Sequence, residues 1–265
     1  MGDGMKGRAF ASMALAVTLA VTGQAAQQTG AAKESAKAQA ANKAPDLTGV
    51  WAEWRRLSMQ PDQSNLPKQP PAMERAEPMV LTPFGKERFL YNKDPLNERD
   101  RGRNELDPAS HCFPPGPVRI APPFEILQTP TKITIIYEDD HTVRQIFTDG
   151  RKHPDDLELT WNGHSIGKWE GDTLVVDTIG MRDESWLDGA GHVHSDQLHL
   201  VERIRRVSHE VLEIKRTLTD PKVLAQPWSQ TTTYPLSPGW DLIENYRCEE
   251  HLQRGTYLGE GPSGL

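Results

Sequence analysis

Apolar and polar residues alternate in short runs through the second half of the chain. From Phe124 onward, runs rich in β-branched and aromatic residues recur about every ten residues, with turn residues between them. Several connectors are too short for parallel crossovers and suit hairpins. The pattern predicts a mainly β fold, an antiparallel up-and-down meander that closes into a lipocalin-like barrel. The expected strands are 124–128, 132–138, 142–148, 164–169, 173–179, 197–207, 211–219, 230–234 and 241–246.

The first half of the chain adds one strand and one short helix to this pattern. Residues 47–54 mix β-branched and aromatic side chains after a Pro-Asp pair, which is typical of a strand. Thr82 followed by Pro83 predicts a helix that ends near Tyr91, because Thr caps helices and Pro favours their first position. Pro-rich and charged residues dominate the rest of 55–118, which is expected to cover the barrel.

The N-terminal residues have the composition of a signal peptide. Lys6 and Arg8 precede an apolar run at 9–21, and the small residues Ala25 and Ala26 suit cleavage. The run is too short to span a bilayer, and no later stretch approaches the ~20 apolar residues of a membrane helix. We therefore expect a periplasmic or secreted protein. The expected divisions are a signal peptide at 1–26, a flexible linker at 27–44 and a single β-barrel domain at 45–265, in which the long segment 55–118 covers the core meander 124–248.

Charge and cysteine content narrow the partners. The chain has 37 acidic and 30 basic residues, a formal net charge of −7, and no basic patch, which argues against nucleic acid. Cys112 and Cys248 are its two cysteines, and an isolated pair in an exported protein favours a disulfide over a metal site. The expected partner is a small molecule, with no nucleic acid and no membrane span, while the oligomeric state stays open.

Five motifs in consistent order carry a family resemblance. They are PDLTGVW (Pro45–Trp51), FEILQTP (Phe124–Pro130), TDGRKHP (Thr148–Pro154), GKWEGDTLVVDT (Gly167–Thr178) and WLDGAGHVHSDQLHLVER (Trp186–Arg203). Together they resemble a large family of exported bacterial proteins of unassigned function. The resemblance implies a lipocalin-like barrel outside the cytoplasm and implies no reaction. The family pattern reads PHSD where this chain has VHSD, so His194, Ser195 and Asp196 match it, while His192 departs from it.

Candidate catalytic groups lie on the strand segment that begins near residue 192. With a period of two, His194, Asp196 and Glu202 share one face with Leu198 and Leu200, and these leucines mark the face as apolar. Acids and imidazoles that face a barrel interior are candidates for acid/base catalysis.

A buried salt bridge is the alternative interpretation of Glu202. Desolvation would raise its pKa unless an arginine holds it charged, and Arg144 and Arg216 are the expected partners by residue type. A second alternative is a zinc or other divalent-ion site made by His192, His194 and Asp196, which have the ligand types and same-face spacing that zinc accepts. Otherwise no cofactor is expected.

A second group of residues is expected to form a binding site at one mouth of the barrel. Its histidines, arginine and glutamate could bind an anionic group or move a proton, and two loop tryptophans could line a cavity. Taken singly, each histidine has an ordinary surface or hydrogen-bonded role as its alternative. The expected binding residues are Glu138, His141, Arg144, His153, Trp161, His164 and Trp186.

These observations favour an enzyme but leave other functions open. The chain has no G-x-S-x-G elbow, P-loop, H-E-x-x-H or dinucleotide-binding motif, which argues against nucleotide chemistry and a serine hydrolase. The leading hypothesis is a cofactor-free acid/base enzyme of lyase, isomerase or hydrolase type that acts on a small, partly hydrophobic organic molecule. The alternatives are a non-catalytic carrier or sensor of a hydrophobic metabolite, a metal-dependent enzyme, and a structural protein with a solidly packed barrel.

Overall fold

The computed structural model describes residues 44–54, 77–93, 98–99, 103–104, 106–119, 121–139 and 142–243. All of them belong to one compact unit, Ala44–Leu265. Several sequence-based predictions concern residues outside this described part. These are the signal segment at 1–26, residues 27–43 of the expected linker, His141 and Cys248. The signal peptide and the disulfide between Cys112 and Cys248 therefore stay predictions.

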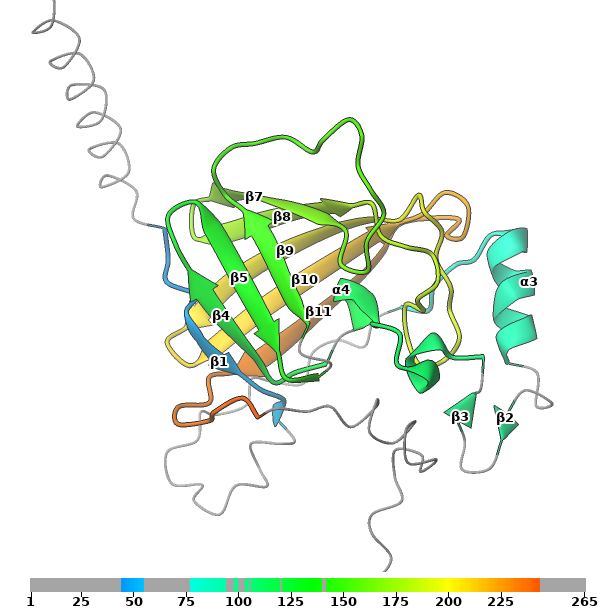
Figure 1. Cartoon of the computed structure of the whole chain (residues 1–265), viewed down its shortest axis with the longest axis horizontal. Helices are drawn as coiled ribbons and strands as arrows, with labels where there is room; N and C mark the ends of the chain where they lie inside the picture. The colour runs from blue at the N-terminus through cyan, green and yellow to red at the C-terminus, as the bar shows by residue number, and fades with distance from the viewer. Residues whose placement is uncertain are drawn as a thin grey trace, which may run out of the picture. The chain divides into compact units, whose positions relative to one another are not determined.

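Nine strands form one sheet whose order follows the chain (Figure 1). The expected mainly β meander is confirmed, because each strand from β4 to β10 pairs with the next along the sequence. The strands are β1 (Gly49–Trp51), β4 (Phe124–Gln128), β5 (Lys132–Tyr137), β6 (Val143–Phe147), β7 (His164–Glu170), β8 (Thr173–Ile179), β9 (His199–Ser208), β10 (Val211–Thr219) and β11 (Trp228–Pro235).

The sheet curls until its two edge strands meet. Trp51 of β1 forms a β-bridge with Leu236, just after β11. Ala52 N donates to Pro235 O at 3.1 Å, and Ser237 N donates to Val50 O at 2.8 Å. These bonds join the end of β1 to the end of β11 and leave a nearly closed barrel.

One strand pair departs from the expected antiparallel pattern. β6 and β7 pair in parallel, through Ile146 with Ser165 and Phe147 with Ile166. The expectation that all pairs are antiparallel is wrong here, because the connection 148–163 is long enough to carry the chain back to the start of β6 (Figure 1). The first half of β6 therefore has no ladder partner on the β7 side, and the barrel wall is interrupted there.

Alternate residues of each strand point inward, as the period of a strand requires. One hydrophobic cluster includes Ile204 and Ile214, and a second includes Leu200 and Leu218. On the inward face of β9, Glu202 lies between Leu200 and Ile204. On the inward face of β10, Arg216 lies between Ile214 and Leu218. A charged layer therefore separates the two hydrophobic clusters.

Residue patterns predicted most element boundaries well. The strands expected at 124–128, 173–179 and 211–219 coincide with β4, β8 and β10. The strand expected at 241–246 is wrong for its described part, since residues 241–243 are not in a strand.

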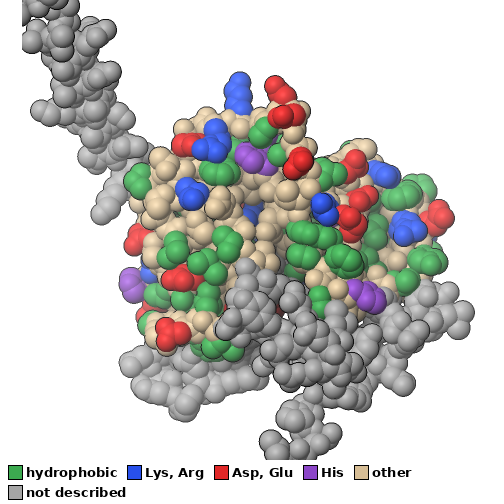
Figure 2. Space-filling view, viewed as in Figure 1, with side chains coloured by type: hydrophobic (Ala, Val, Ile, Leu, Met, Phe, Trp, Pro, Cys, Tyr) green, Lys and Arg blue, Asp and Glu red, His purple; other side chains and the backbone are tan. Residues whose placement is uncertain are grey.

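Helix α3 (Pro83–Asn92) begins where the sequence predicts. Thr82 Oγ1 accepts a hydrogen bond from Gly85 N at 3.1 Å and donates to Lys222 O at 2.7 Å, so the cap also docks the helix on the turn after β10. The other small elements are β2 (Glu98–Arg99), β3 (Arg103–Asn104), a 3₁₀ helix (Pro108–His111) and α4 (Gly116–Arg119). Among the described residues, no helix is both long enough and apolar enough to cross a membrane. Acidic and basic side chains are intermixed over the face shown in Figure 2.

Candidate functional site

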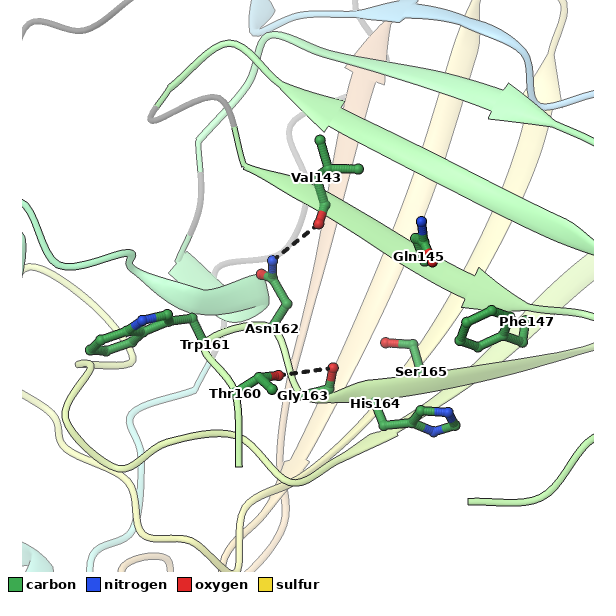
Figure 3. Close-up of a pocket in the computed structure, with 9 residues that line it drawn as sticks. All are labelled: Val143, Gln145, Phe147, Thr160, Trp161, Asn162, Gly163, His164 and Ser165. Atoms are coloured by element: carbon green, nitrogen blue, oxygen red, sulfur yellow. Dashed lines mark hydrogen bonds between the residues drawn. The ribbon is translucent and has the colours of Figure 1, made fainter. Parts of the chain in front are cut away.

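A pocket of about 390 Å³ opens where the barrel wall is interrupted. Its two sides are the outward residues of β6 and the segment Thr160–Ser165, which leads into β7 (Figure 3). Phe147 and His164 lie at one end, and Trp161 lies at the other. The lining residues are Val143, Gln145, Phe147, Thr160, Trp161, Asn162, Gly163, His164 and Ser165.

Local interactions hold the two sides of this pocket. Asn162 Nδ2 donates to Val143 O at 3.4 Å, across the interruption. The rings of Phe147 and His164 stack with centroids 5.5 Å apart, so the outward side chains of β6 and β7 still meet. Gly163 has φ +63°, and a Cβ there would lie 2.5 Å from Ile179 O, which explains why glycine turns the chain into β7.

His164 is the first member of a hydrogen-bonded chain of histidines. His164 Nδ1 lies 2.8 Å from His153 Nδ1, and His153 Nε2 lies 3.2 Å from Asp177 Oδ1. His199 Nε2 reaches the same carboxylate oxygen at 2.9 Å. The members come from the connection 148–163 and from β7, β8 and β9, on the outer face of the barrel. We call His164, His153, Asp177 and His199 the histidine relay.

The carboxylate of Asp177 determines the tautomers of the relay. An ionised carboxylate only accepts, so neutral His153 donates Nε2–H to it and leaves Nδ1 as an acceptor. His164 then donates Nδ1–H to His153, and its own Nε2 carries a lone pair. Among the described residues, His164 Nε2 makes no hydrogen bond. This assignment follows from the network.

The pKa of His164 is compatible with a base at neutral pH. Partial burial, followed by the nearby His153 and Arg151, lowers the pKa of His164 below its ordinary value of 6.5. The ring is therefore largely neutral at pH 7. Arg151 lies over the Phe147 ring at 3.8 Å and is ion-paired with Asp149 at 2.6 Å, at the turn that follows β6.

Glu202 faces the barrel interior, where the sequence placed it. It is 1 % exposed and lies between two buried guanidinium groups, 2.5 Å from Arg144 Nη2 and 3.3 Å from Arg216 Nε. Burial alone would raise the pKa of Glu202, but Arg144 and Arg216 together lower it below its ordinary value. Both arginine partners named from residue type are therefore present.

Hydroxyl groups complete this buried layer. Arg144 donates to Ser165 Oγ at 3.2 Å and to Thr178 Oγ1 at 2.9 Å, and Arg216 donates to Tyr234 Oη at 3.2 Å. Glu202 Oε2 and Arg216 Nε contact their ionic partners, but neither makes a hydrogen bond of standard geometry among the described residues. The arginine layer, Arg144, Glu202 and Arg216, is thus charged, buried and incompletely hydrogen-bonded.

His194 is buried, but it does not join Glu202. Ser185 Oγ lies 2.9 Å from His194 Nε2, and His194 Nδ1 lies 3.0 Å from Ser195 O. Burial lowers the pKa of His194. The neighbouring Ser195 donates from N and Oγ to Asp220, at 2.6 and 2.8 Å, which anchors the loop before β9 on the turn after β10.

Asp196 is exposed, and its expected place on the inward face is wrong. Residues 196–197 form a turn before β9 begins at His199, so the period of two does not extend back to His194. The expected grouping of His194, Asp196 and Glu202 in one chamber fails for this reason.

The expected metal ligands also diverge. His192 bonds Asp188 at 2.7 Å and stacks on Phe89 of α3 at 4.2 Å, while His194 bonds Ser185. Among the described residues, no group of three or more histidine, cysteine, aspartate or glutamate side chains is arranged to hold a metal.

The expected mouth cluster is brought together only in part. His153 and His164 meet, while Arg144 points inward to Glu202. Glu138 Oε2 accepts from Trp240 Nε1 at 3.3 Å, so it anchors the segment after β11. Trp161 lines the pocket, while Trp186 is buried and forms a β-bridge with Val193.

Sequence reasoning missed three residues of this site. Asp177 and His199 lie on outward positions of β8 and β9, and Ser165 on an inward position of β7. Asp177 is the one acid within an otherwise apolar and threonine-rich strand, which was an available signal. Joining Asp177 with His199 required the register of β8 on β9, which the pattern alone did not give.

Comparison of the chain with protein-family models, with curated proteins and with solved structures found no match. The family resemblance of its motifs stays a prediction.

Proposed function

We propose that this protein is a cofactor-free acid/base enzyme whose base is His164 Nε2, acting on a small organic molecule bound in the β6–β7 pocket. The observation that carries the proposal is the histidine relay beside that pocket. It orients one imidazole through a second imidazole and a carboxylate, and the first imidazole lines the pocket. A base oriented in this way needs no further reorganisation when it accepts a proton.

The relay supports proton transfer in two steps. His164 Nε2 accepts a proton from the substrate, and the Nδ1 proton of His164 then passes to His153 Nδ1 across 2.8 Å. The positive charge then lies on His153, whose Nε2 stays 3.2 Å from the carboxylate of Asp177. Returning the proton along the same bonds makes His164 Nε2–H the acid of a later step. This cycle suits a lyase, an isomerase or a hydrolase.

The N-terminal segment indicates in which compartment the enzyme would act. The charged start, apolar run and small residues of 1–26 support export, so the enzyme would act in the periplasm or outside the cell.

Hydrolysis of p-nitrophenyl acetate by the folded protein tests the base. Here His164 Nε2 takes a proton from water as the water oxygen attacks the ester carbonyl, and p-nitrophenolate leaves. A positioned base contributes about 10²–10⁴-fold to its own reaction, so we expect His164→Gln to lose at least about tenfold on this probe. The pH–rate midpoint should lie below the ordinary imidazole value of 6.5, because the pKa of His164 is lowered.

His209→Gln is the matched control, since His209 is exposed at the turn between β9 and β10 and has no part in the relay. Equal losses in the two variants, or an unchanged rate in His164→Gln, would remove His164 as the base. Nitrogen NMR of the imidazoles gives an independent measurement without substrate. We expect His164 to carry its proton on Nδ1, and a proton on Nε2 in the neutral ring would contradict the relay.

A further inference from the structure

A buried cation lies directly behind the floor of the pocket. Ser165 lines the pocket and is 1 % exposed, and its hydroxyl accepts a hydrogen bond from Arg144 Nε at 3.2 Å. One small side chain therefore separates a bound molecule from a guanidinium group inside the barrel.

The arginine layer carries more positive than negative charge. Arg144 and Arg216 are 2 % and 8 % exposed, and among the described residues Glu202 is the carboxylate within 4.0 Å of both. Their other hydrogen-bond partners among the described side chains are hydroxyl groups, on Tyr137, Ser165, Thr178 and Tyr234. One unit of positive charge is thus left in a medium of low dielectric constant, where its field is weakly screened.

The pocket itself adds no opposing charge. None of the nine described residues that line it is acidic. Arg182 lies over the Trp161 ring at 5.4 Å and donates to Leu159 O, so a second cation stands at that end. Arg151 at the other end is neutralised by Asp149.

Part of the lining is apolar and aromatic. Val143, Phe147 and Trp161 supply two aromatic rings and one branched side chain, in a volume that suits a small organic molecule. Such walls favour a planar, unsaturated body.

We infer that the pocket selects an organic carboxylate with a flat apolar body, its negative charge attracted by the arginine layer behind Ser165 and by Arg182. This inference rests on the proposed function, because it names the substrate class of the same pocket.

Three aromatic probes of one shape and different charge test the inference on the wild-type protein. Benzoate, benzamide and benzylamine are titrated at pH 7.5, and binding is followed through the ring NMR signals of His164. We expect benzoate to bind at least about tenfold more tightly than benzamide, with benzylamine weakest, and the preference to shrink as salt is added. Equal binding of benzoate and benzamide, or no binding of any probe at His164, would overturn the inference.

Variants then show which positive charge causes the preference for benzoate. Arg182→Gln should weaken benzoate several-fold and leave benzamide unchanged. Arg203→Gln is its control, because it removes the same charge from an exposed arginine of β9 that pairs with Glu170 at the far end of β7. In the interior, Arg144→Lys should keep the benzoate preference and Arg144→Gln should lose it. Should Arg144→Gln not fold, the wild-type probe series still decides. Equal effects of Arg182→Gln and Arg203→Gln on benzoate would contradict a charge placed at the pocket.

The outcomes separate this inference from the proposed function. If His164→Gln loses ester hydrolysis while benzoate and benzamide bind alike, the base stands and the carboxylate class falls. If benzoate is preferred while His164→Gln hydrolyses normally, the pocket binds carboxylates and His164 is not its base.

Discussion

Two guanidinium groups share one carboxylate inside the barrel, so the stability of the protein should depend strongly on Glu202. Removing its charge leaves Arg144 and Arg216 buried without a counter-ion. Breaking a buried pair by deleting one partner costs about 3–5 kcal/mol. We therefore expect Glu202→Gln to lower the free energy of unfolding by about that amount at pH 7, measured by urea denaturation.

The pH dependence of this loss distinguishes the charge from packing. The lowered pKa of Glu202 means that its stabilisation is complete above the ordinary glutamate pKa and is lost as the pH falls through the lower folded value. The gap between wild type and Glu202→Gln should therefore narrow at acid pH. Glu170→Gln is the control, because Glu170 pairs with Arg203 while half exposed, and its loss should be below about 1 kcal/mol at any pH. A gap for Glu202→Gln that is independent of pH would refute the ionic explanation.

Asp177 is a positioning residue in this proposal, and the tautomer of His164 tests that role. Asp177→Asn replaces the acceptor that fixes His153 with an amide that can also donate, so the order of the relay is no longer determined. We expect His164 to show both neutral tautomers by nitrogen NMR and to lose part of its ester hydrolysis, with an unchanged urea midpoint. Asp155→Asn, at an exposed site on the same connection, should change neither. A single Nδ1–H tautomer in Asp177→Asn would show that the carboxylate does not order the relay.

The pocket exists because β6 and β7 pair over only two residues. Gly163 sets the backbone conformation with which the chain enters β7. Gly163→Ala forces a Cβ to within 2.5 Å of Ile179 O at a φ of +63°. Gly150→Ala is a matched control, since Gly150 has a φ of +84° and a Cβ added there would meet no atom within 4 Å. Both variants should lose about 1–2 kcal/mol for the left-handed backbone. Gly163→Ala should lose more on urea denaturation and also shift the ring signals of His164, whereas equal losses would show that the contact with Ile179 is relaxed at little cost.

At the element scale, local signals predicted more of this molecule than long-range ones. The boundaries of β4, β8 and β10 and the Thr82 cap follow from residue types and period. The parallel pairing of β6 with β7 does not, because the connection 148–163 carries no hydrophobic pattern that distinguishes a return crossing from a hairpin.

The residues of the site show the same difference between local and long-range signals. Glu202 with Arg144 was predictable, since an inward carboxylate needs a cation, whereas Asp196 failed because a turn interrupts the period before β9.

For the whole molecule, the shifted groups together predict how stability varies with pH. The pKa values of Glu202, His164 and His194 are lowered in the folded protein. Burial would raise the pKa of Asp188, but the side-chain bond and the charge of His192 and the backbone hydrogen bonds to the carboxylate together lower it. For each of them the unfolded chain binds more protons, so stability falls as the pH falls. Burial raises the pKa of Tyr137, which has the opposite consequence above the ordinary tyrosine value.

The free energy of unfolding should therefore be highest between about pH 7 and pH 10. It should decline first as the two histidines begin to titrate below about pH 6.5 and again as the acids titrate below about pH 4.5, because each folded pKa lies under its unfolded value. Urea midpoints from pH 3 to 11 measure the curve. In Glu202→Gln the lower step should shrink while the histidine step stays, since His164 bonds His153 and His194 bonds Ser185 and neither pairs with Glu202. Stability that rises on acidification from pH 7 to pH 5 would contradict the neutral state of the partly buried His164 and the buried His194.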